Sequence, residues 1–369
     1  MSSTADLLHR LRNFVQDEAS TQFQQLEYQW SRPRAVRVAK GWAIEGLRVS
    51  HADKRFVRLH CDTNNSRFRE GDLLVLHRGS AQDPNALHVE LQYDGELELD
   101  VSIIRGNINL LFLEPDGWIL DQDWFNASPF YLDALNTVAD SLRGRSIILP
   151  LLQNTLIPRI DYARYERAAG ELAGIGLNDS QVEAVSQAYA ADYLHLIQGP
   201  PGTGKTLMLA HLARLLVADG QRVLVTALTH RAIHNALNKI LQVEENIDVC
   251  KIGPVQNNDD LNVPGFETFA DSHFGNIHEG YVIGATPFAV QTERLSNVEF
   301  DVVLFDEASQ VTLPLAIMGM LAGNKYIFIG DEKQLPPVTV TDAGQAAQAS
   351  IFEYLAGRGN ETMLNITYR

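Results

Sequence analysis

An eight-residue stretch near the middle of the chain constrains the fold more than any other part of the sequence. It fits the phosphate-binding pattern G-x-x-x-x-G-K-[ST] at every fixed position. Residues 194–198, just before it, form a short apolar run typical of a buried strand, and residues 207–218, just after it, carry apolar side chains at helical spacing. The order strand, loop, helix predicts a nucleotide site, whose residues are Gly199, Pro200, Pro201, Gly202, Thr203, Gly204, Lys205 and Thr206.

Each fixed position of this loop has a chemical reason. Glycines let backbone N–H groups close around phosphates, Lys205 is placed to reach the β- and γ-phosphates, and the Thr206 hydroxyl is placed to hold Mg²⁺. The alternative is a Gly-Pro turn that only leads into a helix. A chance match to the whole pattern is expected in about one chain in a hundred of this length, so the nucleotide site is favoured.

The bulk composition is that of a globular chain with room for more than one domain. The 369 residues suffice for two or three cores, and 45% of them are hydrophobic and 21% charged. Apolar runs such as residues 147–152 are too short to cross a bilayer, and the N-terminus lacks the layout of a signal peptide. Cys61 and Cys250 have no spacing typical of a disulfide framework or a zinc site. We therefore expect a cytoplasmic protein without a membrane partner.

Charge is distributed unevenly along a chain whose net charge is −16. Residues 31–70 contain ten Lys or Arg against four Asp or Glu, whereas residues 90–140 contain eleven acids against one base, Arg105. The basic stretch is either a solvated surface or a face for a phosphate backbone. Trp42, Phe56 and Phe68 lie within it and could stack on single-stranded bases. Because aromatic residues of small barrels mostly belong to the core, we expect a core role first.

The N-terminal half changes its hydrophobic period twice. Residues 4–30 carry apolar side chains at helical spacing and are followed by Pro33, which predicts a long amphipathic helix. From residue 35 to about residue 120 the period becomes two, which predicts a small β-barrel. Helical spacing returns in residues 129–143 and 157–172. The candidate barrel strands are residues 36–38, 56–59, 73–76, 87–91 and 97–101.

From residue 178 onward, helical patterns alternate with short apolar strands, which is typical of a parallel sheet. One of these strands, residues 302–305, runs directly into Asp306 and Glu307. Acids at the carboxyl end of a buried strand lie where such a sheet binds its ligand. We expect Asp306 to complete the Mg²⁺ sphere and Glu307 to orient and deprotonate the attacking water. The alternative is a pair of ordinary surface acids that cap a strand. The candidate strands are residues 194–198, 222–228, 248–252, 281–285, 302–305 and 326–329.

A second polar group follows the strand at residues 326–329. Gln334 lies four residues after the glycine that ends this strand, and Pro336 and Pro337 stiffen the exit. An amide can accept a hydrogen bond from water and donate one to a γ-phosphate oxygen. Gln334 is therefore predicted to sense the state of the nucleotide.

These ordered blocks resemble the first motor domain of superfamily 1 helicases. They are most similar to the B branch, which contains the nonsense-mediated RNA decay helicase, the immunoglobulin-mu-binding helicase and the Dna2-like nuclease-helicases. The blocks that carry the resemblance are residues 177–181, 199–206, 226–233, 284–286, 306–310, 330–337, 350–353 and 364–369.

The resemblance implies further roles that the residues alone do not. Gln181 would read the adenine edge, Tyr368 would pack near the adenine, and Arg369 would lie near the γ-phosphate. The nucleic-acid backbone would be contacted by Thr229, His230 and Thr286. ATP and Mg²⁺ are the implied cofactors, and the implied partner is single-stranded DNA or RNA, between which these contacts do not distinguish.

We expect an α/β fold: the RecA-like parallel sheet of a P-loop NTPase, preceded by a helical stalk and a small β-barrel. The expected boundaries are residues 1–31 for a stalk helix, 32–125 for the barrel, 126–176 for returning stalk helices and 177–369 for the RecA-like domain. The expected function is that of an ATP-dependent helicase or translocase of superfamily 1B. An alternative is a nucleotide-gated nucleic-acid-binding or scaffold module that does not unwind.

Family helicases also carry a second RecA-like domain, with an arginine that reaches across to the γ-phosphate. The 369 residues end before any such block. An arginine supplied by a partner can raise turnover by about 10³–10⁵ in related sites. We therefore expect this chain alone to bind ATP weakly and to hydrolyse it negligibly, with a second RecA-like domain as its partner, in cis or in trans.

Overall fold

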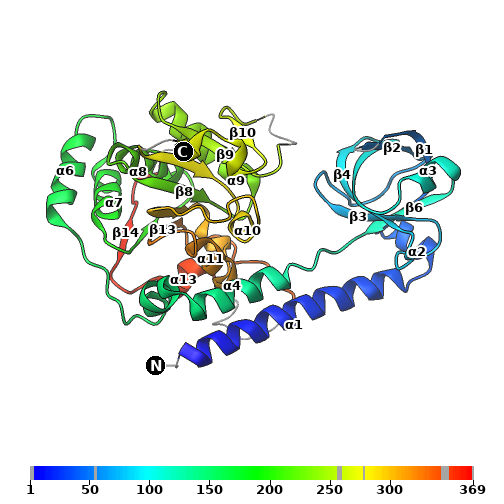
Figure 1. Cartoon of the computed structure of the whole chain (residues 1–369), viewed down its shortest axis with the longest axis horizontal. Coiled ribbons are helices and arrows are strands. Elements are labelled where there is room, and N and C mark those ends of the chain that lie inside the picture. The colour runs from blue at the N-terminus through cyan, green and yellow to red at the C-terminus, as the bar shows by residue number, and fades with distance from the viewer. Residues whose placement is uncertain (1–3, 54–55, 256–259, 277–278, 342–348, 368–369) are drawn as a thin grey trace. The chain divides into compact units, whose positions relative to one another are not determined.

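The computed structural model describes residues 4–53, 56–255, 260–276, 279–341 and 349–367. The chain forms two compact units. The larger unit contains Met1–Asp17 and Ser128–Arg369, and the smaller contains Glu18–Ala127. Helix α1 (Thr4–Trp30) begins in the larger unit and ends in the smaller one. Figure 1 shows the elements coloured along the chain.

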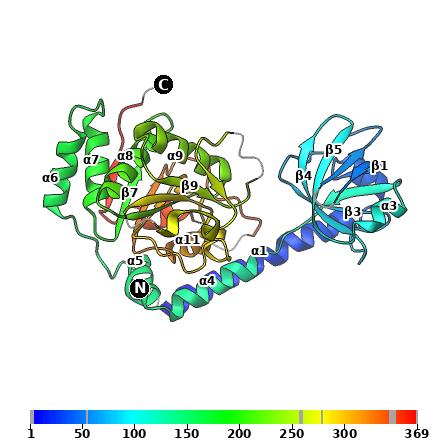
Figure 2. The same cartoon turned by 45° about the horizontal axis from the view of Figure 1, so that its top comes forward.

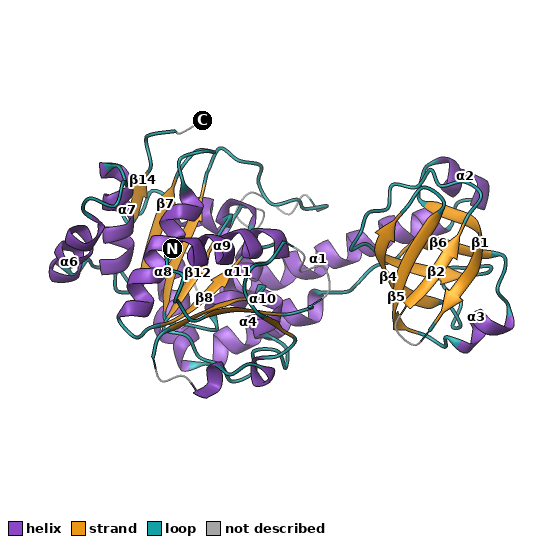
Figure 3. Cartoon of the chain, turned by 90° about the horizontal axis from the view of Figure 1, so that it is seen from above, coloured by secondary structure: helices purple, strands orange, loops and turns teal. Residues whose placement is uncertain are grey.

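The smaller unit is built on a closed barrel of six antiparallel strands, in the order β1-β2-β5-β4-β3-β6 (Figure 3). Alternate strand residues point into one core, as the twofold hydrophobic period requires. Phe68 lies in this core, while Trp42 and Phe56 are only half-buried. The strands are β1 (Ala43–Ala52), β2 (Phe56–His60), β3 (Leu73–His77), β4 (Leu87–Asp94), β5 (Glu98–Arg105) and β6 (Trp118–Gln122), with helices α2 (Arg34–Ala39) and α3 (Asn109–Leu113) beside them.

One predicted barrel strand is wrong. Residues 36–38 lie in helix α2, which begins directly after Pro33. The side chain that this helix buries is Arg37, whose Nη1 lies 2.7 Å from Oδ2 of Asp121 on β6. Two valines spaced by two residues were too short a pattern to define a strand, and a distant ion pair decides which face of the segment is buried.

The larger unit contains an eight-stranded sheet, in the order β10-β9-β11-β8-β12-β13-β7-β14, in which all neighbours run parallel. The six predicted strands are all present. The two that were not predicted, β10 and β14, are the shortest and lie at the two edges. The strands are β7 (Leu194–Gln198), β8 (Arg222–Thr226), β9 (Val249–Ile252), β10 (Gly265–Phe266), β11 (Tyr281–Gly284), β12 (Val302–Phe305), β13 (Lys325–Gly330) and β14 (Glu361–Met363).

Both faces of this sheet are buried, which explains the near-continuous apolar strands. Val223 and Val225 of β8 pack into one core, and Leu224 between them packs into the other. Helices α7 (Asp179–Ala190), α8 (Lys205–Ala218) and α9 (His230–Val243) cover the first face, with α6 (Tyr162–Leu172) beside α7 (Figure 2). The second face is covered by α4 (Ser128–Asp140), α5 (Leu149–Leu152), α11 (Leu313–Met320), α13 (Ile351–Leu355) and the start of α1.

The remaining elements of the larger unit are short. They are a π-helix (Gly144–Ile148), helix α10 (Pro287–Val290) and 3₁₀ turns at Phe269–Asp271, Phe274–Asn276 and Ala308–Gln310.

The parallel sheet and the closed barrel confirm the predicted fold class. None of the helices in the described ranges combines the length and apolarity that a membrane span requires. The expected cytoplasmic location stays a prediction. Both cysteines are buried free thiols.

Candidate functional site

The phosphate-binding loop connects the end of β7 to the start of α8. Gly202 and Gly204 have φ angles of 83° and 87°, in the left-handed region that favours glycine. At Gly199 a Cβ atom would lie 2.4 Å from Oγ1 of Thr203, which itself donates to the carbonyl oxygen of Pro200 at 2.8 Å. The loop can therefore close on itself only with glycine at these positions.

The ammonium group of Lys205 is held inside this loop. Its side chain is buried, and Nζ donates to the carbonyl oxygen of Gly199 at 2.8 Å. The same glycine donates its N–H to the carbonyl oxygen of Gly330, at the end of β13, at 3.0 Å. The loop is thus tied to the neighbouring strand, and the Lys205 ammonium, which has three N–H donors, keeps donors for a phosphate oxygen.

The acid pair lies at the carboxyl end of β12. Asp306 is 4% exposed, and its Oδ1 accepts from the N–H of Glu307 at 3.0 Å. Burial and the neighbouring charge of Glu307 raise the pKa of Asp306 to about 7. Glu307 has a φ of 49°, and its Oε2 is buried with no hydrogen-bond partner among the described residues. Two adjacent acids with an unpaired buried oxygen form a site that a cation and an ordered water would complete.

A cavity of about 230 Å³ joins this acid pair to helix α9. Thr206, Asp306 and Glu307 line one part of it. The remaining lining residues are Leu228, Thr229, Arg231, Ala232, Asn235 and Gln310. The oxygen donors of Thr206 and Asp306 suit a hard divalent cation such as Mg²⁺, which commonly takes one or two protein oxygens together with phosphate and water. Within the described ranges, no group of three or more His, Cys, Asp or Glu side chains could hold a metal ion by itself.

Gln334 is connected to the segment of the acid pair by a hydrogen bond with Ser309. Sequence reasoning did not single out Ser309. The Ser309 hydroxyl donates to Oε1 of Gln334 across 3.5 Å, and the backbone N–H of Gln334 donates to the carbonyl oxygen of Asp331 at 3.1 Å. Ser309 stands in the same block as Asp306 and Glu307, three and two residues later. That position was the only signal in the sequence for its role.

Gln181 supports the phosphate-binding loop from helix α7. It is 2% exposed and forms a reciprocal capping pair with Asn178. Its Nε2 donates to the carbonyl oxygen of Thr203 at 3.0 Å. The predicted contact of Gln181 with adenine stays a prediction, and the structure adds a contact with the loop that the sequence did not indicate.

The three predicted nucleic-acid contacts follow two neighbouring strands of the sheet. Thr229 caps helix α9 after β8, accepting from the N–H of Ala232 at 3.2 Å, and His230 beside it is exposed. Thr286 follows β11, the strand paired with β8, and makes no capping hydrogen bond to helix α10. All three lie at the same edge of the sheet as the phosphate-binding loop. Tyr368 and Arg369 lie outside the described residues.

Two further residues of this edge lie in the predicted block 226–233 but received no individual role in the list of expected contacts. Arg231 lines the cavity that contains Glu307, although its only signal is its position after His230. Thr226 ends β8, and its carbonyl oxygen accepts from the N–H of Asp306 at 2.9 Å. The buried Thr226 hydroxyl has no partner among the residues that the structure describes. A buried hydroxyl without a protein partner typically forms a hydrogen bond with an ordered water.

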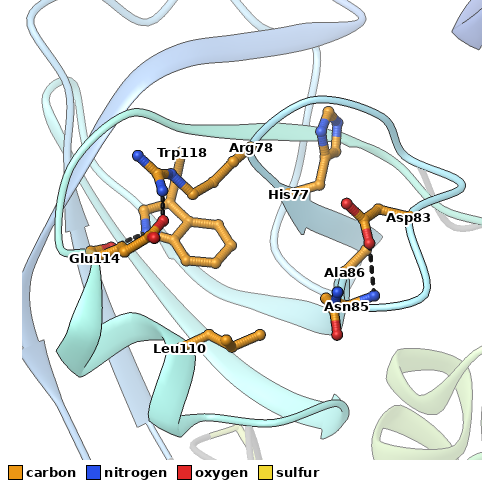
Figure 4. Close-up of a pocket in the computed structure, with 8 residues that line it drawn as sticks. All are labelled: His77, Arg78, Asp83, Asn85, Ala86, Leu110, Glu114 and Trp118. Carbon is orange, nitrogen blue, oxygen red and sulfur yellow. Dashed lines mark hydrogen bonds and ion pairs between the residues drawn. The ribbon is translucent and has the colours of Figure 1, made fainter.

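A separate hollow of about 260 Å³ lies on the barrel (Figure 4). At one end Arg78 pairs with Glu114, and at the other the Asp83 carboxylate accepts from the N–H of Asn85 at 2.8 Å. The indole N–H of Trp118, between these ends, donates to the carbonyl oxygen of Glu114 at 2.7 Å. The charged groups at both ends are paired within the barrel, whereas Nδ1 of His77, which also lines the hollow, has no hydrogen-bond partner among the described residues.

Comparison with known proteins places the larger unit in a family. A family model for the AAA domain matches residues 176–354. The Saccharomyces cerevisiae protein "DNA replication ATP-dependent helicase/nuclease DNA2" is 32% identical over 200 residues, which are 52% of this chain and 13% of that protein. The larger unit is thus similar to the Dna2-like helicases, within the superfamily 1B branch. This confirms the family predicted from the ordered blocks.

A second relative matches a longer part of the chain. The Bos taurus protein of the same name is 25% identical over 318 residues, which are 81% of this chain and 29% of that protein. The chain thus spans 13% and 29% of the length of these two Dna2-like relatives. Among solved structures, an arterivirus nonstructural protein 10 (helicase) aligns with a TM-score of 0.40 and 15% identity, over 87% of this chain and 55% of that one.

Proposed function

We propose that this chain contains the ATP-binding motor domain of an ATP-dependent helicase or translocase that moves along single-stranded nucleic acid. One observation carries the proposal. A single cavity is lined by the expected magnesium and water-activating residues, Thr206, Asp306 and Glu307, and also by Thr229 at the start of α9. Loss of the γ-phosphate would therefore occur beside the start of helix α9, which is expected to hold the nucleic-acid strand.

The roles in hydrolysis follow from the contacts of each side chain. Lys205 uses its remaining N–H donors to bind the β- and γ-phosphates and stabilises the charge that develops on them. Thr206 and Asp306 would hold Mg²⁺, which when bound neutralises phosphate charge. Glu307 accepts a proton from the attacking water through the buried oxygen that has no partner in the protein.

Gln334 and Ser309 supply the response to the state of the nucleotide. Their hydrogen bond is long at 3.5 Å, so a γ-phosphate oxygen or the attacking water can compete for either group. Gln334 follows β13, whose last residue also binds the phosphate loop through the Gly199 N–H. Loss of the γ-phosphate would thus release the Gln334 amide, which follows a β-strand that contacts the phosphate-binding loop.

A second RecA-like domain is the proposed partner, present in the same polypeptide or in another chain. It would supply an arginine to the γ-phosphate, as the family resemblance implies, and without it the motor domain would turn ATP over negligibly. We propose DNA as the strand, because the two curated relatives compared above are named as DNA replication helicase/nucleases.

The test is ATP hydrolysis measured with and without single-stranded DNA. The 369-residue chain should show little turnover, and adding a second RecA-like domain should produce turnover that the strand stimulates. Strong strand-stimulated turnover by the chain alone would refute the need for a partner. ATP binding that is unchanged in Lys205→Ala would refute the nucleotide site itself.

A further inference from the structure

A hollow on the smaller unit combines aromatic and glutamine side chains, and basic residues lie near its two aromatic rings. It has a volume of about 380 Å³ and lies between the C-terminal part of helix α1 and Trp42, the residue just before β1. Tyr28 is 55% exposed on one side of it, and Trp42 is half-buried on the other. The remaining lining residues are Thr21, Gln24, Gln25 and Gln29.

The lining residues of α1 share one face of the helix. Their spacing of three and four residues places Thr21, Gln24, Gln25 and Tyr28 in a row, which Arg32 continues just after the helix ends. None of the lining residues carries a charge. Amide side chains can both donate to and accept from the edge of a nucleobase, so this face offers hydrogen bonds together with a tyrosine ring.

Two cations lie over the two aromatic rings, and a third basic residue contacts the backbone just before Trp42. The guanidinium carbon of Arg32 lies 5.0 Å from the centre of the Tyr28 ring, and Nζ of Lys40 lies 5.7 Å from that of Trp42. Arg67 is exposed, and its backbone N–H donates to the carbonyl oxygen of Gly41, the residue before Trp42, at 3.0 Å. In the part of the chain that the structure describes, none of these three cations has a carboxylate partner within 4.0 Å.

Several other arginines around the barrel differ in this respect, although Arg69 and Arg105 also lack a carboxylate partner within 4.0 Å among the described residues. Each of five has an acidic partner: Arg34 with Glu45, Arg37 with Asp121, Arg48 with Asp62, Arg58 with Asp100 and Arg78 with Glu114. Four of the ten basic residues in 31–70 are thus paired within the unit. The cations near Trp42 remain available to an anionic ligand.

We propose that this hollow is a second binding site for single-stranded nucleic acid, distinct from the edge of the parallel sheet. Unstacked bases pack on Tyr28 and Trp42, and their phosphates pair with Arg32, Lys40 and Arg67. A duplex keeps its bases stacked, so it cannot use the rings. That the ligand is a single strand of nucleic acid rests on the proposed function. The position of the site rests on the contacts around Trp42.

The first experiment locates the strand by photo-crosslinking. Oligodeoxythymidylate and oligouridylate that carry 5-iodouracil are irradiated with the full chain in the absence of nucleotide, and crosslinked residues are mapped by mass spectrometry. Crosslinks at Tyr28 or Trp42 are expected, and the more efficient oligonucleotide identifies the sugar. Crosslinks confined to the larger unit would overturn the proposal. The variant Lys205→Ala should crosslink in the same way, which separates this site from the proposed ATP-dependent function.

The second experiment measures affinity by fluorescence anisotropy over a range of salt concentrations. Tyr28→Ala and Trp42→Ala should each weaken binding about tenfold, while Tyr93→Ala, an equally exposed tyrosine outside the hollow, should not. The double variant Arg32→Gln, Lys40→Gln should reduce the slope of log affinity against log salt by about 0.7 per cation, and Arg34→Gln should leave the slope unchanged. Equal affinities and slopes for all variants would overturn the site, as would capture of an acidic peptide in place of the oligonucleotide.

Discussion

The side-chain amide of Gln181 joins the start of helix α7 to the phosphate-binding loop. It donates to the carbonyl oxygen of Thr203 at 3.0 Å and accepts from the N–H of Asn178 at 3.1 Å. The packing around it is tight, because a Cβ atom at Gly204 would lie 2.9 Å from its Nε2. The shape of the loop thus depends on a residue 22 positions earlier in the chain.

Gln181→Glu separates support of the loop from recognition of adenine. The new carboxylate still accepts from Asn178 but cannot donate to Thr203, so we expect ATP affinity to fall about tenfold, the effect of about one hydrogen bond. If Gln181 also contacts the adenine edge, affinity for ATP should fall more than affinity for GTP. Titration with fluorescent analogues of both nucleotides measures this. Gln187→Ala on the same helix is the control, and unchanged ATP affinity in Gln181→Glu would contradict the role in the loop.

Lys205 and Glu307 should separate binding from hydrolysis. Lys205→Ala removes the cation that faces the phosphates and should abolish nucleotide affinity. Glu307→Gln should keep affinity and lower turnover about 10²–10⁴-fold, because an amide cannot take a proton from water. Binding is measured on this chain, and turnover on a preparation that includes the proposed second RecA-like domain. Equal loss of binding in both variants would show that the two roles are wrongly assigned.

The sequence predicted those parts of the fold that are encoded locally. The six central strands have near-continuous apolar residues because both faces of the sheet are covered, and a run of that kind needs no knowledge of distant partners. Strand β14 was not predicted because Glu361 and Met363 are exposed. This strand pairs with β7, from which it is more than 160 residues distant, and the hydroxyl of Thr362 lies 2.9 Å from Nε2 of His195. Strand β14 is therefore stabilised by contacts with a distant part of the chain and not by a local sequence pattern.

The candidate site divides in the same way. The phosphate-binding loop and the acid pair follow from spacing after a strand, so Lys205, Thr206, Asp306 and Glu307 could be named from the sequence. The contacts of Gln181 with Thr203 and of Ser309 with Gln334 depend on how separate loops meet at one edge of the sheet. Because no local pattern encodes those distances, the structure was needed to find them.

Acid should destabilise the larger unit through His195. Burial, with a smaller effect of Lys325, lowers the pKa of His195 to about 3, from an unfolded value of about 6.5. Between these pH values the unfolded chain binds a proton that the folded chain does not, so the free energy of unfolding falls as pH falls through this window, by at most about 1.4 kcal/mol per pH unit. Urea unfolding followed by circular dichroism measures it. His195→Asn should flatten this dependence between about pH 6.5 and pH 4, whereas the exposed-site control His9→Asn should retain the wild-type slope.

The buried ion pair of the barrel should matter far more than an exposed one. Arg37 and Asp121 are 5% and 1% exposed, and Oδ2 of Asp121 also lies 2.8 Å from Nε2 of His77. Asp121→Asn leaves the Arg37 charge buried without a counter-charge, which typically costs about 3–5 kcal/mol. Glu45→Gln breaks the exposed pair with Arg34, whose atoms lie 3.8 Å apart, and should cost less than about 1 kcal/mol.

The chain provides a specific probe for this comparison. All four tryptophans, Trp30, Trp42, Trp118 and Trp124, belong to the smaller unit. Urea unfolding followed by tryptophan fluorescence therefore reports the barrel rather than the nucleotide-binding domain. We expect a large drop of the midpoint for Asp121→Asn, a small one for Glu45→Gln, and unchanged ATP affinity for both. Equal midpoints for the two variants would mean that burial does not determine the strength of the Arg37 pair, because the two pairs differ above all in their exposure to water.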